Sequence, residues 1–229
     1  MATNALVSFE ANWETIGHLL EVGADTRRSQ NQIAAVNRAA LVFCITAWES
    51  YVEDVAREAA DYIADNCAKF SDLPKEVRKT VVAKVTPHDY PKKPDGATDS
   101  GARPSDLADD GWRRVYRDLV YAATEGSAFN TPKADNVRAL FQRWFDLDVT
   151  DSWRWQKFPA PEAAARLNES IRIRGSIIHT GEKPQGINKN WINTYGERNI
   201  RKLVEKTDAA LIPHVRNLCI TDDTPVAFG

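Results

Sequence analysis

Apolar side chains recur at steps of three and four residues along most of this chain, which is the spacing that one buried face of an α-helix requires. The longest such stretch covers about 31–68. Because each helical residue adds about 1.5 Å, a helix of that length would cross a domain, so we expect it to be the central element of the fold. Its predicted apolar stripe consists of Ile33, Val36, Ala40, Phe43, Ala47, Tyr51, Val55, Ala59 and Ile63.

Helical spacing also appears in six other segments, and strand signals are sparse, so the sequence predicts an all-α fold. Thr131 is a candidate cap ahead of Pro132 for one of these helices, and Gly181 stands where another should end. We expect the last helical segment to be interrupted at Gly196 and kinked or broken at Pro213. The six segments are 5–20, 74–85, 112–123, 134–145, 161–179 and 191–219.

The length of the chain, 229 residues, suits one large domain over 1–229. Within it, 86–111 is rich in proline and glycine and poor in apolar residues. We expect a long irregular loop there. In a compact domain such a loop is either functional, for example as a lid, or a disordered connector, and the residues leave both interpretations open.

Charge and cysteine content limit the setting in which the protein works. A net charge of −2 excludes a general basic coat for non-specific nucleic-acid binding, although a local basic patch is compatible with it. Cys44, Cys67 and Cys219 lack zinc-ligand spacing, and a disulfide framework is not expected in a chain of this size, so we predict a reducing cytoplasm. We see no signal-peptide pattern and no apolar run of about 18 residues, so no membrane association is expected.

One histidine, His179, follows two arginines, Arg172 and Arg174, near the expected end of the helix at 161–179. A histidine exchanges protons near neutral pH because its reference pKa is about 6.5. An arginine keeps its charge and presents a fork of donors to a phosphate. Together they are the minimum needed to cleave a phosphodiester without a metal. On an ideal helix Arg172 shares a face with His179, whereas Arg174 lies about 140° away. The β-branched pair at 177–178 and the glycine just beyond suggest a distorted last turn, so geometry leaves both arginines as candidates.

The positive charge of the chain is concentrated around this histidine. The stretch 166–202 holds eight lysines or arginines and three acids, a net charge of +5 in a chain of net charge −2. A focused positive field suits a polyanionic ligand. Besides Arg172, we regard Lys183 and Lys189 as candidate phosphate contacts. The nearby run 153–157 alternates tryptophan with cations; it suits stacking on single-stranded RNA bases, but packing beneath a loop is the favoured interpretation.

The string RGSIIHTG at 174–181 resembles the R-x(4–6)-H signature of the HEPN superfamily. The segment AWESYV at 47–52 is similar to the glutamate-bearing helix of the RiboL-PSP-HEPN branch, and FNTP at 129–132, followed by Asn136-Val137 and Leu140-Phe141, resembles a helix entry in that branch. These features span about 32–181. The resemblance implies a HEPN-type helical bundle that dimerises and cuts RNA without metal or other cofactor, in a cleft at the dimer interface.

The resemblance also implies roles for individual residues. His179 would act as general acid or base on the 2′-hydroxyl or the leaving oxygen, and Arg174 would stabilise charge on the phosphoryl group, giving a 2′,3′-cyclic phosphate and a 5′-hydroxyl. Glu49 is either a solvated position beside the apolar stripe or a carboxylate that orients Arg174 or His179. Gly175 stands where the family commonly has Asn, Asp or His, and Ser176 is the candidate that would compensate for it.

The leading hypothesis is therefore a cytoplasmic, homodimeric endoribonuclease. Family analogy adds a role in prokaryotic defence or as a toxin-like effector, with an antitoxin or inhibitor protein as a candidate partner. The rival is a non-catalytic HEPN module that binds nucleic acid or a partner protein, with its motif degraded at Gly175. A third interpretation is a structural helical domain whose basic patch serves assembly. RNA identity and the activating signal do not follow from the sequence.

Overall fold

The computed structural model describes residues 3–23, 29–85, 104–125, 129, 131–181, 184 and 186–220. The all-α prediction is confirmed: this part of the chain is helical and contains no strand, apart from one isolated bridge between Trp155 and Phe158. The helices are α1 (Asn4–Gly23), α2 (Gln30–Asn66), α3 (Lys75–Val85), α4 (Gly111–Thr124), α5 (Ala134–Phe145), α6 (Ala160–Thr180), α7 (Lys189–Ile192), the π-helix η5 (Asn193–Ile200) and α8 (Arg201–Leu218), with short 3-10 helices η1 (Phe70–Asp72), η2 (Pro104–Leu107) and η4 (Val149–Ser152).

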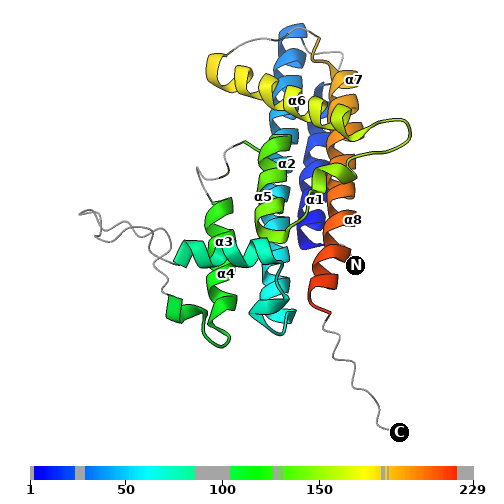
Figure 1. Cartoon of the computed structure of the whole chain (residues 1–229). Coiled ribbons are helices and arrows are strands. Elements are labelled where there is room, and N and C mark those ends of the chain that lie inside the picture. The colour runs from blue at the N-terminus through cyan, green and yellow to red at the C-terminus, as the bar shows by residue number, and fades with distance from the viewer. Residues whose placement is uncertain are drawn as a thin grey trace, which may run out of the picture.

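Helix α2 runs the length of the molecule and is the axis of the fold, as expected (Figure 1). Helices α1 and α8 pack along it, α4 covers its C-terminal half, and α6 contacts it near its N-terminal half. Because neighbours cover several sides, residues outside the predicted stripe are also buried, among them Leu41, Trp48 and Val52. The prediction that Phe43 belongs to the buried stripe is wrong, because this residue is 50% exposed.

The start of α1 is fixed by residues from two distant helices. The carboxylate of Glu58 on α2 accepts hydrogen bonds from the backbone amides of Asn4 and Ala5, at 3.0 and 3.1 Å. The hydroxyl of Thr3 accepts from the amide of Leu6 and donates to Asp208 of α8, at 2.7 Å. The free amides at a helix N-terminus need such acceptors, so α1 is joined to α2 and α8 at this end.

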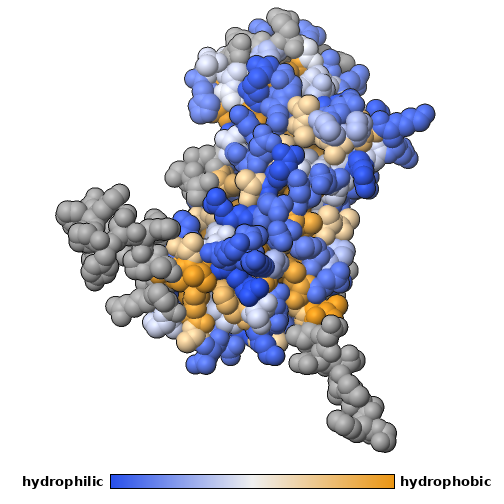
Figure 2. Space-filling model, viewed as in Figure 1, coloured by the Kyte–Doolittle hydropathy of each residue, from blue (hydrophilic) through white to orange (hydrophobic). Residues whose placement is uncertain are grey.

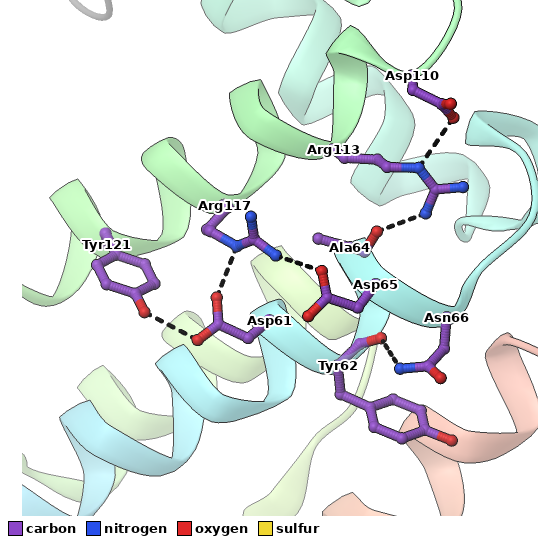
Figure 3. Close-up of polar contacts among 9 residues, drawn as sticks. All are labelled: Asp61, Tyr62, Ala64, Asp65, Asn66, Asp110, Arg113, Arg117 and Tyr121. Atoms are coloured by element: carbon purple, nitrogen blue, oxygen red, sulfur yellow. Dashed lines mark hydrogen bonds and ion pairs between the residues drawn. The ribbon is translucent and has the colours of Figure 1, made fainter.

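A polar network joins α2 to α4 (Figure 3). The guanidinium of Arg117 binds Asp61 at 2.6 Å and Asp65 at 2.7 Å, and the hydroxyl of Tyr121 donates to the second oxygen of Asp61. Arg113 donates to the carbonyl of Ala64 and pairs with Asp110 of its own helix, as Figure 3 also shows. These contacts are partly exposed and fix the orientation of α4 more than they add stability.

Of the local predictions about helix ends and breaks, those at Thr131 and Pro213 are wrong. Thr131 does not cap α5; the N-cap position is Lys133, and the amide of Ala134 donates instead to the side chain of Asn168 on α6, at 3.0 Å. In the C-terminal region the α-helix is interrupted around Gly196, as expected, by the π-helix η5, but the chain stays helical there. The break expected at Pro213 is wrong, because α8 continues past this exposed residue.

The physical reason lies in the packing of this region. At Gly196 an added Cβ would lie 3.1 Å from the Cys44 sulfur and 3.3 Å from Trp13, so the absence of a side chain permits close contact with α1 and α2. Around Pro213, Leu211 and Val215 are buried, and their packing maintains the helix where proline removes a backbone donor. Tertiary contacts therefore override the local preference of both residues.

The expectation of unpaired cysteines is wrong for two of the three. Cys67, at the C-terminal cap of α2, and Cys219, just after α8, form a disulfide with their Cα atoms 4.2 Å apart. Cys44 is buried and takes no part in the disulfide. The sequence argument missed this pair because 152 residues separate the two cysteines and only the fold brings them together. The bond also removes the cysteine-based argument for a reducing compartment.

Two further expectations concern a loop and the membrane. Of the loop predicted at 86–111, residues 86–103 lie outside the described part of the chain, and the remainder includes η2 and the first residue of α4. Helix α2 is long and apolar enough to span a membrane. This is weak evidence for a membrane span, because a buried core helix and an N-terminal signal sequence meet the same criteria. Most of its apolar side chains belong to the core of the bundle, and the face drawn in Figure 2 is mostly hydrophilic with separate apolar patches.

The buried hydroxyl of Tyr51 provides a test of this core. It lies 3.2 Å from the carbonyl of Val204 and 3.3 Å from the carboxylate of Asp208, within a side chain that is almost completely buried. Tyr51→Phe leaves both acceptors short of a donor, so we expect it to lower the free energy of unfolding by about 1–3 kcal/mol. Urea denaturation measures this change. Tyr121→Phe, which removes a partly exposed hydroxyl from Asp61, is the control and should cost less than about 1 kcal/mol; equal losses would contradict the prediction.

Candidate active site

Helix α6 begins inside the bundle and leaves it. Its buried residues, Ala163, Leu167, Ser170 and Ile171, all lie in the first half, and every residue from 172 to 180 is half-buried or exposed. In Figure 1 this second half, drawn in yellow, projects past α2. The motif that the sequence singled out is therefore carried on a projecting helix, with α2 as its nearest support.

The end of α6 is more regular than expected. Sequence analysis suggested a distorted last turn, but the α-helix continues to Thr180. Gly181 then adopts the left-handed conformation, with φ 64° and ψ 18°, and its amide donates to the carbonyl of Ser176. Glycine suits this position because it lacks the Cβ that disfavours positive φ. Arg174 and His179 consequently lie about 140° apart around a regular helix, and roughly 7.5 Å apart along its axis.

Arg174 and Glu49, two of the candidate residues, are brought together. The guanidinium nitrogen Nη2 of Arg174 lies 3.6 Å from Oε2 of Glu49 on α2, and the two side chains are 23% and 18% exposed. The Nε of Arg174 is buried and has no hydrogen-bond partner. A buried donor without an acceptor is costly, so a local shift that let an anion reach this nitrogen would be favoured.

Glu49 lies in a position that disfavours its charged form. Burial raises the pKa of this carboxyl above its usual value, and the positive charge of Arg174 opposes that rise. One turn along α2, burial also raises the pKa of Glu53, where Arg57 opposes the rise and the charge of Glu49 adds to it. The ion pair is thus an arginine held against a carboxylate that the protein partly desolvates.

His179 occupies the last turn of α6 and is exposed. It makes no hydrogen bond or ion pair with another residue in the described part of the chain. The hydroxyl of Ser176 bonds the carbonyl of Ile173 in its own helix, at 2.9 Å. At Gly175 an added Cβ would meet nothing within 4 Å, so a larger residue would fit there. The imidazole is therefore accessible, and among the described residues nothing holds it in a fixed orientation.

The three candidate phosphate contacts differ in their surroundings. Arg172 is largely exposed and binds the carboxylate of Glu169 through two nitrogens, each at 2.8 Å. Lys189 is exposed at the start of α7. Lys183 lies outside the described residues. The structure thus leaves Lys189 accessible on the surface, whereas Arg172 already has an anionic partner within its helix.

Other features of the site region also emerge. Packing is confirmed for Trp153, which is fully buried and donates from Nε1 to Thr207 at 2.9 Å, whereas Trp155 is only half-buried. The sequence patterns do not reveal Phe158, Trp191 and Tyr195, half-buried aromatic residues that the fold brings together around Arg166 of α6. No periodic signal marks them, because they come from separate segments.

The described part of the chain offers no metal centre as an alternative to the motif. Among the described residues, no group of three or more His, Cys, Asp or Glu side chains could hold a metal ion. A cavity of about 590 Å³ between α1 and the α7–η5 region is lined by residues that include Trp13, His18 and Arg198, but neither Arg174 nor His179 lines it. Of the two motif side chains, His179 is exposed and Arg174 is mostly buried.

The comparisons with known proteins agree with this geometry at the level of the family. A family model described as RiboL-PSP-HEPN matches residues 10–212. The chain matches no curated protein and no solved structure at a significant level. The matched segment contains α2 with Glu49 and α6 with Arg174 and His179, and it covers most of the 229 residues. The chain therefore belongs to the RiboL-PSP-HEPN family.

Proposed function

We propose that the protein is a metal-independent endoribonuclease that works as a homodimer, with Arg174 and His179 as its reacting pair. One observation carries the proposal: Arg174 is held against Glu49 with a buried Nε that has no partner, on the same projecting helix as an accessible imidazole. A fixed cation with donors to spare and a proton-transfer group are what phosphodiester cleavage needs.

The chemistry requires two proton transfers. One imidazole removes the proton of the 2′-hydroxyl as its oxygen attacks phosphorus and forms a bond to it. The bond from phosphorus to the 5′-oxygen breaks, and a second acid delivers a proton to that oxygen. The products are a 2′,3′-cyclic phosphate and a 5′-hydroxyl. Arg174 stabilises the charge that develops on the non-bridging oxygens, and its guanidinium geometry suits two of them at once.

A second copy of the chain supplies what one copy lacks. On a regular helix Arg174 and His179 point to different sides, so a single α6 does not present both groups to one phosphate. A single α6 also carries only one imidazole. The side chains of Ile178 on α6 and Phe43 on α2 are 47% and 50% exposed, and apolar surface of this kind favours association. Two copies that meet at these residues of α6 and α2 would bring two imidazoles and two guanidinium groups to one groove.

The rival function has an observation of its own. Gly175 provides no polar group beside Arg174, and among the described residues none orients His179. This favours a non-catalytic member of the family that binds nucleic acid or a partner protein. A role in prokaryotic defence, a cytoplasmic setting and an antitoxin or inhibitor partner belong to the proposal by family analogy only.

Cleavage of mixed RNA in excess EDTA tests the proposal. We expect the wild type to cut and to leave 2′,3′-cyclic phosphate ends. His179→Ala and Arg174→Ala should each lower the rate about 10²–10⁴-fold, because each removes one of the two groups that the reaction needs. His18→Ala, which changes an exposed histidine on α1, is the control. RNA binding without cleavage by all these proteins would favour the non-catalytic module, and neither binding nor cleavage would favour a structural domain.

Glu49 is tested as a positioning residue. Burial makes the pKa of Glu49 higher in the folded state than in the unfolded state. The free energy of unfolding therefore falls as pH rises from the unfolded-state pKa through the folded-state pKa. Glu49→Gln should therefore raise the free energy of unfolding at pH 7 and leave it unchanged below about pH 3, where the carboxyl is neutral in both states. The cleavage rate should nevertheless fall, by up to about 100-fold, since Arg174 loses its support.

The matched control for Glu49 is Glu53→Gln, one turn along α2, where the pKa is also raised and the ion-pair partner is Arg57. It should reproduce the gain in stability at pH 7 and leave cleavage unchanged. A purely structural role for Glu49 predicts that both variants behave alike in both measurements.

The dimer is tested at Ile178. Ile178→Glu places a charge in the proposed contact, so we expect sedimentation or light scattering to show a monomer and cleavage to fall with the loss of the dimer. Val82→Glu, at an exposed apolar residue on α3, is the control and should leave the mass unchanged. A wild type that is monomeric at the concentrations where it cleaves RNA would refute the two-copy site.

A further inference from the structure

Five half-buried side chains from three segments form a continuous series of contacts on the surface. The rings of Trp155 and Phe158 stack with centroids 4.9 Å apart. The guanidinium of Arg166 lies 4.3 Å from the ring centre of Phe158 and 5.7 Å from that of Tyr195. Tyr195 in turn stacks on Trp191 at 4.1 Å, with the ring planes 10° apart. We call this series, Trp155–Phe158–Arg166–Tyr195–Trp191, the aromatic ladder.

The ladder differs from the aromatic core. Trp48, Trp112 and Trp153 are fully buried, whereas every member of the ladder is half-exposed. Trp155 and Trp191 pack partly against the hydrophobic core. Core packing therefore fixes these rings in place and leaves part of each accessible to a ligand.

One end of the ladder is built by a strained turn. The backbone of Trp155 and that of Phe158 exchange two hydrogen bonds, at 3.0 and 2.6 Å, around Gln156 and Lys157. Both central residues have positive φ, 29° and 67°, in a turn for which asparagine and glycine are preferred. Such strain persists where the surrounding structure or a function requires it. Here the turn places the two aromatic side chains opposite each other, so that they stack.

The charges around the ladder are those of a site for an anion. Arg166 is a member of the series, with Glu162 at 3.1 Å as a partner. Arg154 and Lys157 are exposed on either side of Trp155 in the chain, and Lys189 is exposed two residues before Trp191. Aromatic surfaces for stacking together with cations for phosphates are the two requirements for binding unpaired nucleic acid. In a double helix the bases already stack on one another and offer no free face.

We propose that the aromatic ladder binds the bases of single-stranded RNA and holds the strand that enters the Arg174–His179 site; the inference rests on the proposed function for the identity of the strand. Arg166 precedes Arg174 by eight residues and His179 by thirteen on one helix, so about 12 and 20 Å separate them along the axis. A stacked strand advances about 3.4 Å per nucleotide. The substrate is therefore an unpaired segment of roughly six nucleotides or more.

Binding is measured with full-length His179→Ala protein, so that cleavage does not interfere. The probes are a fluorescently labelled single-stranded 12-nucleotide RNA and a blunt RNA duplex of the same length. Trp155→Leu and Tyr195→Leu keep apolar packing but remove the ring. Each should weaken binding of the single strand by about 5- to 150-fold, the range expected for loss of one stacked base. Trp155→Phe, which retains a ring, should restore most of the affinity.

Tyr62→Leu is the matched control, because it removes an exposed aromatic ring on α2 outside the ladder. Thermal melts of all variants show whether each one is folded, and affinity is compared among folded variants. If Trp155→Phe and the leucine variants bind the single strand as tightly as Tyr62→Leu does, the ladder is not an RNA site. Equal losses for duplex and single strand would also overturn the inference, since stacking on free bases predicts selectivity.

The outcomes separate this inference from the nuclease. Wild-type cleavage that depends on His179, together with unchanged affinity in the ladder variants, would refute the ladder and leave the proposed function standing. Ladder-dependent binding of the single strand by a wild type that does not cleave would remove the nuclease and retain the ladder as a binding site.

Discussion

The burial of α2 on several sides is the constraint on which the rest of the structure depends. A 37-residue helix with apolar residues around most of its circumference exposes more surface than one neighbour covers, so α1, α4 and α8 surround it. Polar contacts then fix how each neighbour is oriented, as Glu58 of α2 does with the start of α1 and Asp61 of α2 does with Arg117 of α4. The same helix carries Glu49, which makes the candidate site an extension of the core.

The Glu49–Arg174 pair shows how that extension works. A carboxylate at the edge of the core is partly desolvated, so its pKa rises, and the positive charge of a nearby cation opposes that rise. Arg174 supplies this charge from α6 and is held in return, with its Nε left without an acceptor. The arrangement is poor as a stabilising ion pair and well suited to presenting a cation to a phosphate.

The sequence predicts what depends on periodicity. The bounds of α5 and the all-α fold follow from apolar spacing, and Gly181 follows from the rule for helix ends. Contacts between distant segments do not follow: Asn168 caps α5 from another helix, Cys67 meets Cys219, and the aromatic ladder draws on three segments. Within the site, the motif identified Arg174 and His179, but only the fold shows that Glu49 reaches Arg174. Phe43 was misplaced because periodicity does not reveal where neighbours end.

The projection of α6 beyond the bundle has a consequence for regulation. If two copies must meet to complete the groove, the active species forms by mass action, and its abundance at low occupancy rises with the square of the amount of chain. A cell making little of the protein would then carry it in a silent state. A modest burst of synthesis, or release from a sequestering partner, would switch it on abruptly without any effector molecule.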